Sequence, residues 1–216
     1  MLVMQKPTKE QLLAQIHTRP LPDIVQDHIF GGDSWAFREN PADYRLLITH
    51  LQERLSLSKG NLAIVGSAKL GYSVSPETFG TPFSEFSDID VIVIDRERFE
   101  EIWKVLLDWR YPWHLRKWPT IERTWGIERL EQFVCGWCAP GGIKYHGLSS
   151  PRLLRPLRQL SENWFDSFKS LSRFPQLASR NVNGRLYRSW SHAMRYHVWS
   201  LERVRQQFPS NTSEIK

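Results

Sequence analysis

Apolar residues gather into two short runs near the middle of the chain. The first run spans Leu62 to Val65, and the second spans Ile89 to Ile94 with a single polar interruption at Asp90. Both are rich in β-branched residues and have the length of strands rather than of helices. The pattern therefore predicts two short, buried β-strands.

Elsewhere, apolar residues recur at spacings of three and four, which predicts amphipathic helices. One helix is expected after Thr8, a favourable N-cap, and another after Asn40, with Pro41 at its first position. The other expected elements are helices over residues 98–109, 163–171 and 183–207, and a third strand over residues 130–137.

These elements indicate a mixed fold of the α/β (α+β) class, in which a small mixed sheet is flanked by N-terminal and C-terminal helices. A chain of 216 residues has room for one large domain or for a small core with helical additions. We expect an N-terminal helical segment over residues 1–58, a core over 59–150 and a C-terminal helical region over 151–216.

Two aspartates at the second strand are the strongest candidates for chemistry. Side chains alternate along a strand, so Asp88 and Asp90 point to the same side. Two carboxylates so close together repel each other, and a hard divalent cation such as Mg²⁺ or Mn²⁺ relieves that repulsion. The alternative is a structural role on an edge strand, although an unpaired carboxylate within an apolar strand is costly.

The first strand ends at Gly66 and Ser67, where glycine permits a close backbone approach and free N–H groups suit a phosphate. A hydrophobic strand, Gly-Ser, a loop and then Asp-x-Asp in the next strand resembles the nucleotidyltransferase superfamily, which has the DNA polymerase β-like fold. The wider pattern over residues 33–95 is similar to a group of mostly uncharacterised bacterial nucleotidyltransferase-domain proteins. It includes Gly66 to Ser73, Ser75-Pro76, Phe79-Gly80, Pro82-Phe83 and Ser87 to Asp90.

The resemblance implies a nucleotidyltransferase core over residues 59–150 and transfer of a nucleoside monophosphate from an NTP, such as ATP, to an acceptor hydroxyl. Asp88 and Asp90 would hold the metal, and Gly66 and Ser67 would contact the phosphates. Lys69 follows closely enough to meet a triphosphate or to be solvated instead. RNA, a protein or a small molecule is the implied acceptor, and toxin–antitoxin or phage-defence systems are the implied setting.

The sequence departs from the superfamily in one respect. Active members place a third carboxylate on a neighbouring strand, and the expected third strand carries only Glu131 near its start. Glu122 and Asp166 are the other candidates. Without a third carboxylate the chemistry slows or stops. The alternative function is therefore a weak or inactive module that binds a nucleotide, a nucleic acid or a partner protein.

Charge is unevenly distributed along the chain. Residues 1–140 contain 16 Lys and Arg against 19 Asp and Glu, whereas residues 141–216 contain 13 against 4. The basic C-terminal region favours an anionic partner, RNA among them. If residues 183–207 are helical, Arg188, His192 and Arg195 share one face, which suits a phosphate and a base or is simply a solvated surface.

Cellular location is indicated by cysteine content and hydropathy. Cys135 and Cys138 are the only cysteines, so a disulfide framework is not expected, and a zinc site with His146 lacks a fourth ligand. No apolar run reaches membrane-spanning length, and no signal peptide is recognisable. We therefore expect a cytoplasmic protein.

Overall fold

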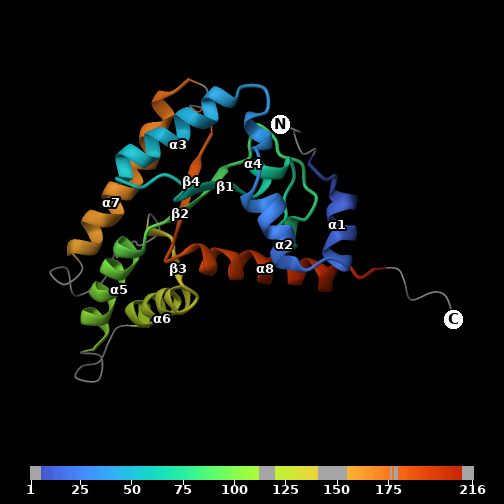
Figure 1. Ribbon diagram of the computed structural model, residues 1–216. Helices are drawn as coiled ribbons and strands as arrows, with labels where there is room; N and C mark the ends of the chain where they lie inside the picture. Colours follow the sequence, from blue (N-terminus) through green and yellow to red (C-terminus); the bar gives the residue numbers. More distant parts are fainter. Residues whose placement is uncertain (1–5, 112–119, 141–154, 176, 178–179, 211–216) are drawn as a thin grey trace.

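The computed structural model describes residues 6–111, 120–140, 155–175, 177 and 180–210. Four strands form one mixed sheet in the order β1-β2-β4-β3. Their bounds are β1 Leu62–Val65, β2 Ile89–Ile94, β3 Trp137–Cys138 and β4 Val182–Tyr187. Figure 1 shows these strands at the centre of the molecule, with helices on both sides.

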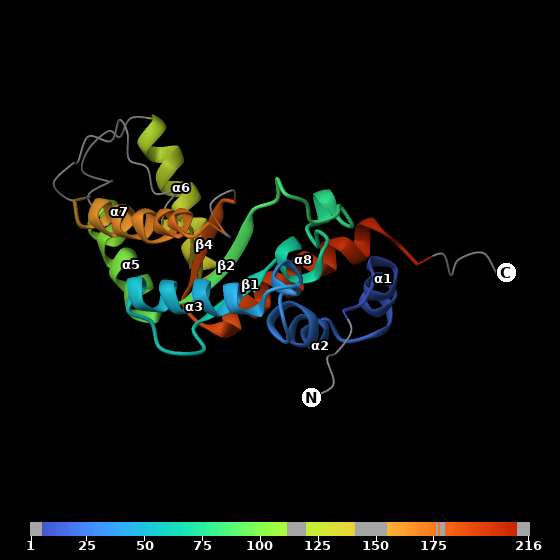
Figure 2. The same ribbon diagram turned by 90° about the horizontal axis from the view of Figure 1, so that it is seen from above.

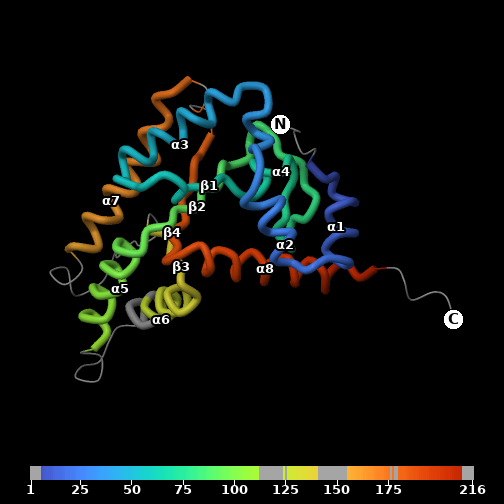
Figure 3. The backbone as a smooth tube through the Cα atoms, in the orientation of Figure 1, coloured from blue at the N-terminus to red at the C-terminus, as the bar shows by residue number. Residues whose placement is uncertain are grey.

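The strands β2 and β4 form the middle of the sheet and run parallel to each other. Asp90 is paired with Asn183, and Ile92 with Arg185. On the other side of β2, β1 runs antiparallel, with Val65 opposite Asp90. Figure 3 follows the chain through β2, in green, and β4, in orange, which lie side by side although they are far apart in sequence.

Helices cover the two faces of the sheet in separate layers (Figure 1). One face packs on α3 Pro41–Leu55, α5 Arg96–Arg110 and α7 Arg155–Lys169, and the other on α8 Trp190–Gln207 together with α1 Lys9–Thr18 and α2 Leu21–Ile24. Alternation along β2 assigns Val91 and Val93 to the first core and Ile92 and Ile94 to the second. Figure 2 shows the division from above, with α5 and α7 at one end and α1 and α2 at the other.

The two predicted apolar strands, now β1 and β2, and the first helices are confirmed. Thr8 caps α1 in a capping box with Gln11, and the Asn40 side chain accepts from the N–H of Ala42 at the start of α3. The helix expected over 98–109 is present as α5, which Asp95 caps by accepting from the N–H of Arg98. Local capping and periodicity are therefore sufficient to define these elements.

The prediction of a strand over residues 130–137 is wrong. These residues continue α6 Thr120–Val134, and only Trp137 and Cys138 form a strand. Phe133 packs on Phe99 and Trp103, with ring centroids 4.7 and 5.5 Å away. The helix ends before Gly136, whose φ of 74° is typical of a residue that terminates a helix.

The prediction that a helix begins at residue 183 is also wrong. Residues Val182–Tyr187 form β4, and the helix begins only at Trp190. Val182 and Leu186 are buried while Asn183 is exposed, which is the alternation of a strand. Gly184 leaves room for α7, because a Cβ there would lie 2.2 Å from the Phe168 ring.

Short helical segments complete the described chain. They are α4 Ser67–Leu70, a π-helix Val25–Phe30 and 3₁₀ turns at Trp35–Phe37, Pro76–Thr78 and Ser170–Arg173. The sheet takes β4 from the expected C-terminal region, and the division at residues 58 and 150 stays a prediction. Among the described residues, no helix has both the length and the apolar character needed to cross a membrane.

Candidate functional site

The end of β1 and the start of β2 bring Gly66 and Asp90 together. Gly66 has φ 67° and ψ −151°, a conformation that is essentially restricted to glycine. A Cβ on Gly66 would lie 3.0 Å from Oδ2 of Asp90. Ser67 then begins α4, and the Gly66 carbonyl accepts from the N–H of Lys69. The missing side chain of Gly66 therefore makes room for the Asp90 carboxylate.

Asp88 is held from the neighbouring strand. Nδ2 of Asn183 donates to Oδ2 of Asp88 at 2.9 Å, and Asn183 is itself the register partner of Asp90. All three side chains are exposed and lie at the start of the two central strands. Two carboxylates and an amide thus meet at one edge of the sheet.

Asp90 is open to solvent on one side but has protein atoms around much of its carboxyl group. This partial desolvation raises its pKa above the ordinary value. The nearby guanidinium of Arg185 opposes the rise, and the negative charge of Asp88 adds to it. A cation bound between the carboxylates would remove both the repulsion and part of the desolvation cost.

A third carboxylate was expected on a strand over residues 130–137, but the strand beside β2 is β4, which carries an amide next to Asp90. Asn183, on the strand beside Asp90, has hard oxygen and nitrogen atoms but no charge. Glu131 and Asp166 are exposed on α6 and α7, and the side chain of Glu122 lies outside the described residues. Among the residues that the structure describes, no group of three His, Cys, Asp or Glu side chains is placed to hold a metal.

A cavity of about 950 Å³ opens beside Asp90. β3 pairs only with Leu186 and Tyr187, so within the described chain the first residues of β4 have a strand neighbour on the β2 side alone. The cavity surrounds this part of β4. Its lining includes Gly66, Asp90, Asn183, Arg185, Tyr196 and His197. This volume is large enough for a mononucleotide.

Cationic side chains surround the cavity on several elements. Lys169 of α7, Arg180 and Arg185 all line it. The Arg180 guanidinium also donates to the backbone carbonyls of Ser84 and Ser87, at 2.7 and 3.1 Å, and so fixes the segment that leads to Asp88. Basic groups around a cavity that also contains the Asp90 carboxylate suit a ligand that carries both phosphates and a metal.

Lys69 does not lie with the aspartates. It is 3 % exposed, and its ammonium donates to the backbone carbonyl of Gly32. Burial lowers its pKa to about 8, an effect that the negative charge of Asp33 partly offsets. The structure thus gives Lys69 a role in attaching α4 to the segment before α3.

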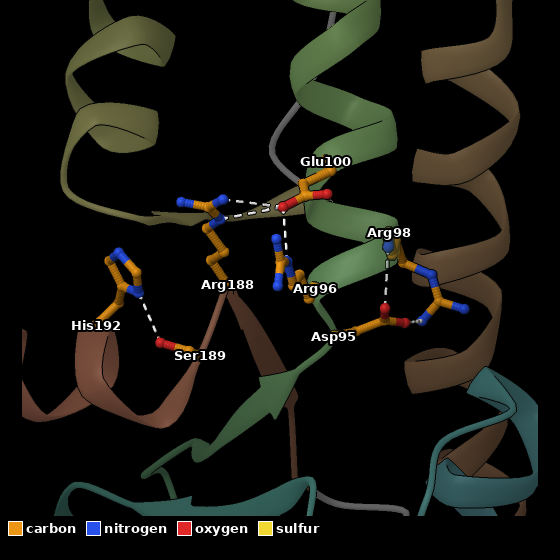
Figure 4. A network of polar contacts seen from close by, with 7 residues as sticks. All are labelled: Asp95, Arg96, Arg98, Glu100, Arg188, Ser189 and His192. Carbon is orange, nitrogen blue, oxygen red and sulfur yellow. Dashed lines mark hydrogen bonds and ion pairs between the residues drawn. The ribbon is translucent and has the colours of Figure 1, made fainter.

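The predicted basic face of residues 188–195 is not a single helical face, because Arg188 precedes α8. Arg188 pairs with Glu100 at 3.0 Å, and the His192 ring bonds to the Ser189 hydroxyl at 2.7 Å, as Figure 4 shows. His192 also packs against Gly136, where a Cβ would lie 2.0 Å from its ring. Arg195 is exposed on α8. None of the three lines the cavity.

Replacing Gly66 by alanine is expected to destabilise the protein by about 1–3 kcal/mol, because the side chain forces a backbone conformation that is strained for any L-residue. The added methyl group would also displace the Asp90 carboxylate. Chemical denaturation with urea measures the first effect, and titration with Mn²⁺ measures the second.

Gly60→Ala is the matched control for this substitution. Gly60 also has a positive φ, of 84°, but nothing lies within 4 Å of a Cβ placed there. Gly60→Ala should therefore reduce stability and leave Mn²⁺ affinity unchanged, whereas Gly66→Ala should reduce both. Equal Mn²⁺ affinity in the two variants would contradict the assigned contact between Gly66 and Asp90.

Sequence reasoning missed Asn183, Arg185 and His197 as parts of this site. Their strand and helix contacts join segments about 90 residues away from Asp90, so no local spacing links them. The alternation of Val182, Gly184 and Leu186 with polar residues was the available signal for a strand, and it would have placed Asn183 and Arg185 on one face.

Comparison of the chain with protein-family models, with curated proteins and with solved structures found no match to any of the three. The site must therefore be interpreted from its own geometry.

Proposed function

We propose that this chain binds a nucleoside triphosphate together with Mg²⁺ or Mn²⁺, as a nucleotidyltransferase-like module with little or no transfer activity. The proposal is based on the group of polar side chains that meet where β2 and β4 begin. Asp88 and Asp90 stand beside Asn183, and Gly66 gives the Asp90 carboxylate its space.

The donor set fits a divalent cation. Two carboxylates supply hard oxygen ligands, and Asn183 keeps its amide oxygen while its nitrogen donates to Asp88. The pKa of Asp90 is raised first by desolvation, against the opposing charge of Arg185 and with a smaller contribution from Asp88, so keeping this carboxylate ionised is costly in the absence of a cation. A bound cation would neutralise the carboxylates and attract phosphate oxygens.

The surrounding cavity fits the rest of a nucleotide. Arg180, Arg185 and Lys169 provide positive charge, and Phe165 on α7 and Tyr196 on α8 provide aromatic surface on the two helices that border the cavity. An amide at the third position cannot accept a proton from an attacking hydroxyl. Binding without efficient transfer is therefore the function that this arrangement supports best.

A second candidate is transfer of a nucleoside monophosphate from the NTP to an acceptor hydroxyl, on RNA, a protein or a small molecule. It is favoured by the contact of Gly66 with Asp90, directly before Ser67 and α4, because this arrangement resembles the Gly-Ser and Asp-x-Asp pattern of nucleotidyltransferases. The two candidates share the metal and the nucleotide and differ in the reaction.

Calorimetry with each NTP, in Mg²⁺, in Mn²⁺ and in EDTA, tests the proposal. We expect metal-dependent binding that weakens at least about tenfold in the Asp88→Asn, Asp90→Asn double variant. The control is Glu101→Gln, Asp108→Asn, which makes the same charge change on the exposed side of α5. Equal NTP binding by the double variant and the wild-type protein would reject the proposed site.

Incubation with α-labelled NTP and total RNA or lysate separates the two candidates. The binding module predicts that label on macromolecules or small products stays at the level of the double variant. Transfer that requires both aspartates would instead establish the enzyme and identify the class of acceptor.

A further inference from the structure

Arg185 is a fixed cation in the wall of the cavity. Its guanidinium lies between two aromatic rings, 4.7 Å from the centroid of Trp137 on β3 and 4.6 Å from that of Tyr196 on α8. It takes part in none of the ion pairs formed between described residues. The rings hold the cation in place beside the cavity, where it also interacts with the hydroxyl groups of Tyr187 and Tyr196.

His197 brings a buried, unpartnered polar atom close to the same wall. The residue is only 8 % exposed and lines the cavity, and its Nε2 is itself buried and has no hydrogen-bond partner among the described residues, so a ligand reaches Nε2 through a rotation of the ring. The ring packs edge-on against Phe30 and Tyr196. A buried polar atom without a partner is costly, so such an atom beside a cavity indicates a place for a ligand.

We propose that Arg185 and His197 form a subsite for a phosphate group between β4 and α8. Arg185 supplies a planar set of N–H donors, and His197 supplies a further donor when its neutral ring carries the proton on Nε2. The phosphate belongs either to the bound nucleotide or to a phosphodiester such as single-stranded RNA. The inference rests on the proposed function, because it assigns the phosphate contacts of that same site.

The electrostatics of the wall are consistent with this assignment. Burial first, and then the charge of Arg185, lowers the pKa of His197 to about 3, so the ring is neutral at physiological pH. Arg185 also lies near enough to Asp90 to lower the pKa of its carboxyl group. A cation on Asp90 would neutralise a carboxylate that lies near the guanidinium, and a phosphate would supply a new counter-charge.

Two substitutions test the subsite. Arg185→Met keeps an unbranched side chain between the rings and removes the charge, and His197→Phe keeps a neutral ring and removes Nε2. The control is Arg203→Met on α8, because Arg203 is exposed, pairs with Glu77 and does not line the cavity. Calorimetry with inorganic pyrophosphate, ATP and an RNA decamer in Mg²⁺ measures binding, and Mn²⁺ titration by electron paramagnetic resonance measures the metal site.

We expect both cavity variants to bind pyrophosphate at least about tenfold more weakly than the wild-type protein, with Arg203→Met unchanged. Loss for ATP alone assigns the phosphate to the nucleotide, and loss for RNA as well assigns it to a phosphodiester. His197→Phe is expected to unfold at the same temperature as the wild-type protein or a higher one, so its loss of binding does not reflect loss of fold.

Pyrophosphate binding that is absent in the wild-type protein, or unchanged in both cavity variants, would overturn the subsite and leave Arg185 as a packing element between two rings. The Mn²⁺ titration keeps this failure separate from failure of the proposed function. If Mn²⁺ and NTP still bind with dependence on the aspartates, only the subsite is rejected.

Discussion

Replacing Asp90 by asparagine should have opposite effects on stability and on binding: the metal-free protein should unfold at a slightly higher temperature, and metal-dependent NTP binding should be lost. The pKa of Asp90 is raised, first by desolvation and also by Asp88, against the opposing effect of Arg185. A raised carboxyl pKa means that the folded state disfavours the ionised form. At neutral pH the charge on Asp90 therefore lowers stability.

The raised pKa of Asp90 also determines how the stability of the protein depends on pH. The contribution of Asp90 favours the fold below its ordinary pKa of 3.8 and is progressively lost as the pH rises through the higher folded value. Asp90→Asn removes this loss. Because one side of the carboxylate remains open to solvent, we expect the gain in melting temperature at pH 7 to be small, on the order of 1–3 °C.

Thermal unfolding in EDTA from pH 4 to pH 7, compared with Asp108→Asn as an exposed control on α5, measures this effect. The wild-type protein should lose more stability across this range than Asp90→Asn does. Added Mn²⁺ should then raise the melting temperature of the wild-type protein and leave that of Asp90→Asn almost unchanged. A metal-free Asp90→Asn protein that melts below the wild type at pH 7 would show that the negative charge serves the fold rather than a ligand.

Local sequence patterns predict the parts of this fold that depend on neighbouring residues. β1 and β2 are short apolar runs, and the starts of α1 and α3 carry side-chain caps at Thr8 and Asn40. Each of these signals requires only a few consecutive residues. The antiparallel pairing of β1 and β2, which was not predicted, then places Gly66 next to Asp90, because it brings the end of one strand beside the start of the next.

The elements that were predicted wrongly are those in which tertiary contacts decide between two local possibilities. Residues 130–137 combine apolar and polar residues in a way that fits a strand, but Phe133 is buried against α5 as part of a helix. The Asn-Gly pair at 183–184 indicates a turn before a helix. It lies instead within β4, where Asn183 faces Asp88 and the absence of a side chain at Gly184 makes room for α7.

The sequence accordingly indicated one part of the candidate site and missed the other. The carboxylates and Gly66 are close in sequence, and their chemistry can be recognised from spacing alone. Arg185 and His197 join them only because β4 runs parallel to β2 and α8 returns across the same face. Parallel pairing requires a long connection, so its register cannot be obtained from local periodicity.

The register of β4 against β2 leads to the second large expected effect: Asn183→Asp should strengthen metal binding and weaken the metal-free fold. Asn183 stands beside Asp90 and donates to Asp88 at 2.9 Å. An aspartate there loses this hydrogen bond and adds a third negative charge to the group. In EDTA the melting temperature should fall by several degrees, with the reduction growing as the pH rises above about 4, where aspartates ionise.

With Mn²⁺ the effect of Asn183→Asp on stability reverses, because the third carboxylate becomes a charged oxygen ligand in place of an amide. We expect Mn²⁺ to bind at least about tenfold more tightly and to produce a larger rise in melting temperature than in the wild-type protein. The matched control is Asn163→Asp, whose side chain is exposed on α7 and does not line the cavity. The same charge at position 163 should change Mn²⁺ affinity much less.

Equal Mn²⁺ affinity in Asn183→Asp and Asn163→Asp would mean that position 183 does not face the cation. The label-transfer assay on the same pair of variants extends the test to chemistry. If Asn183→Asp transfers nucleotide and Asn163→Asp does not, the amide at position 183 is what keeps this site from catalysis. Tighter metal binding without transfer would instead show that the site lacks more than one carboxylate for the reaction.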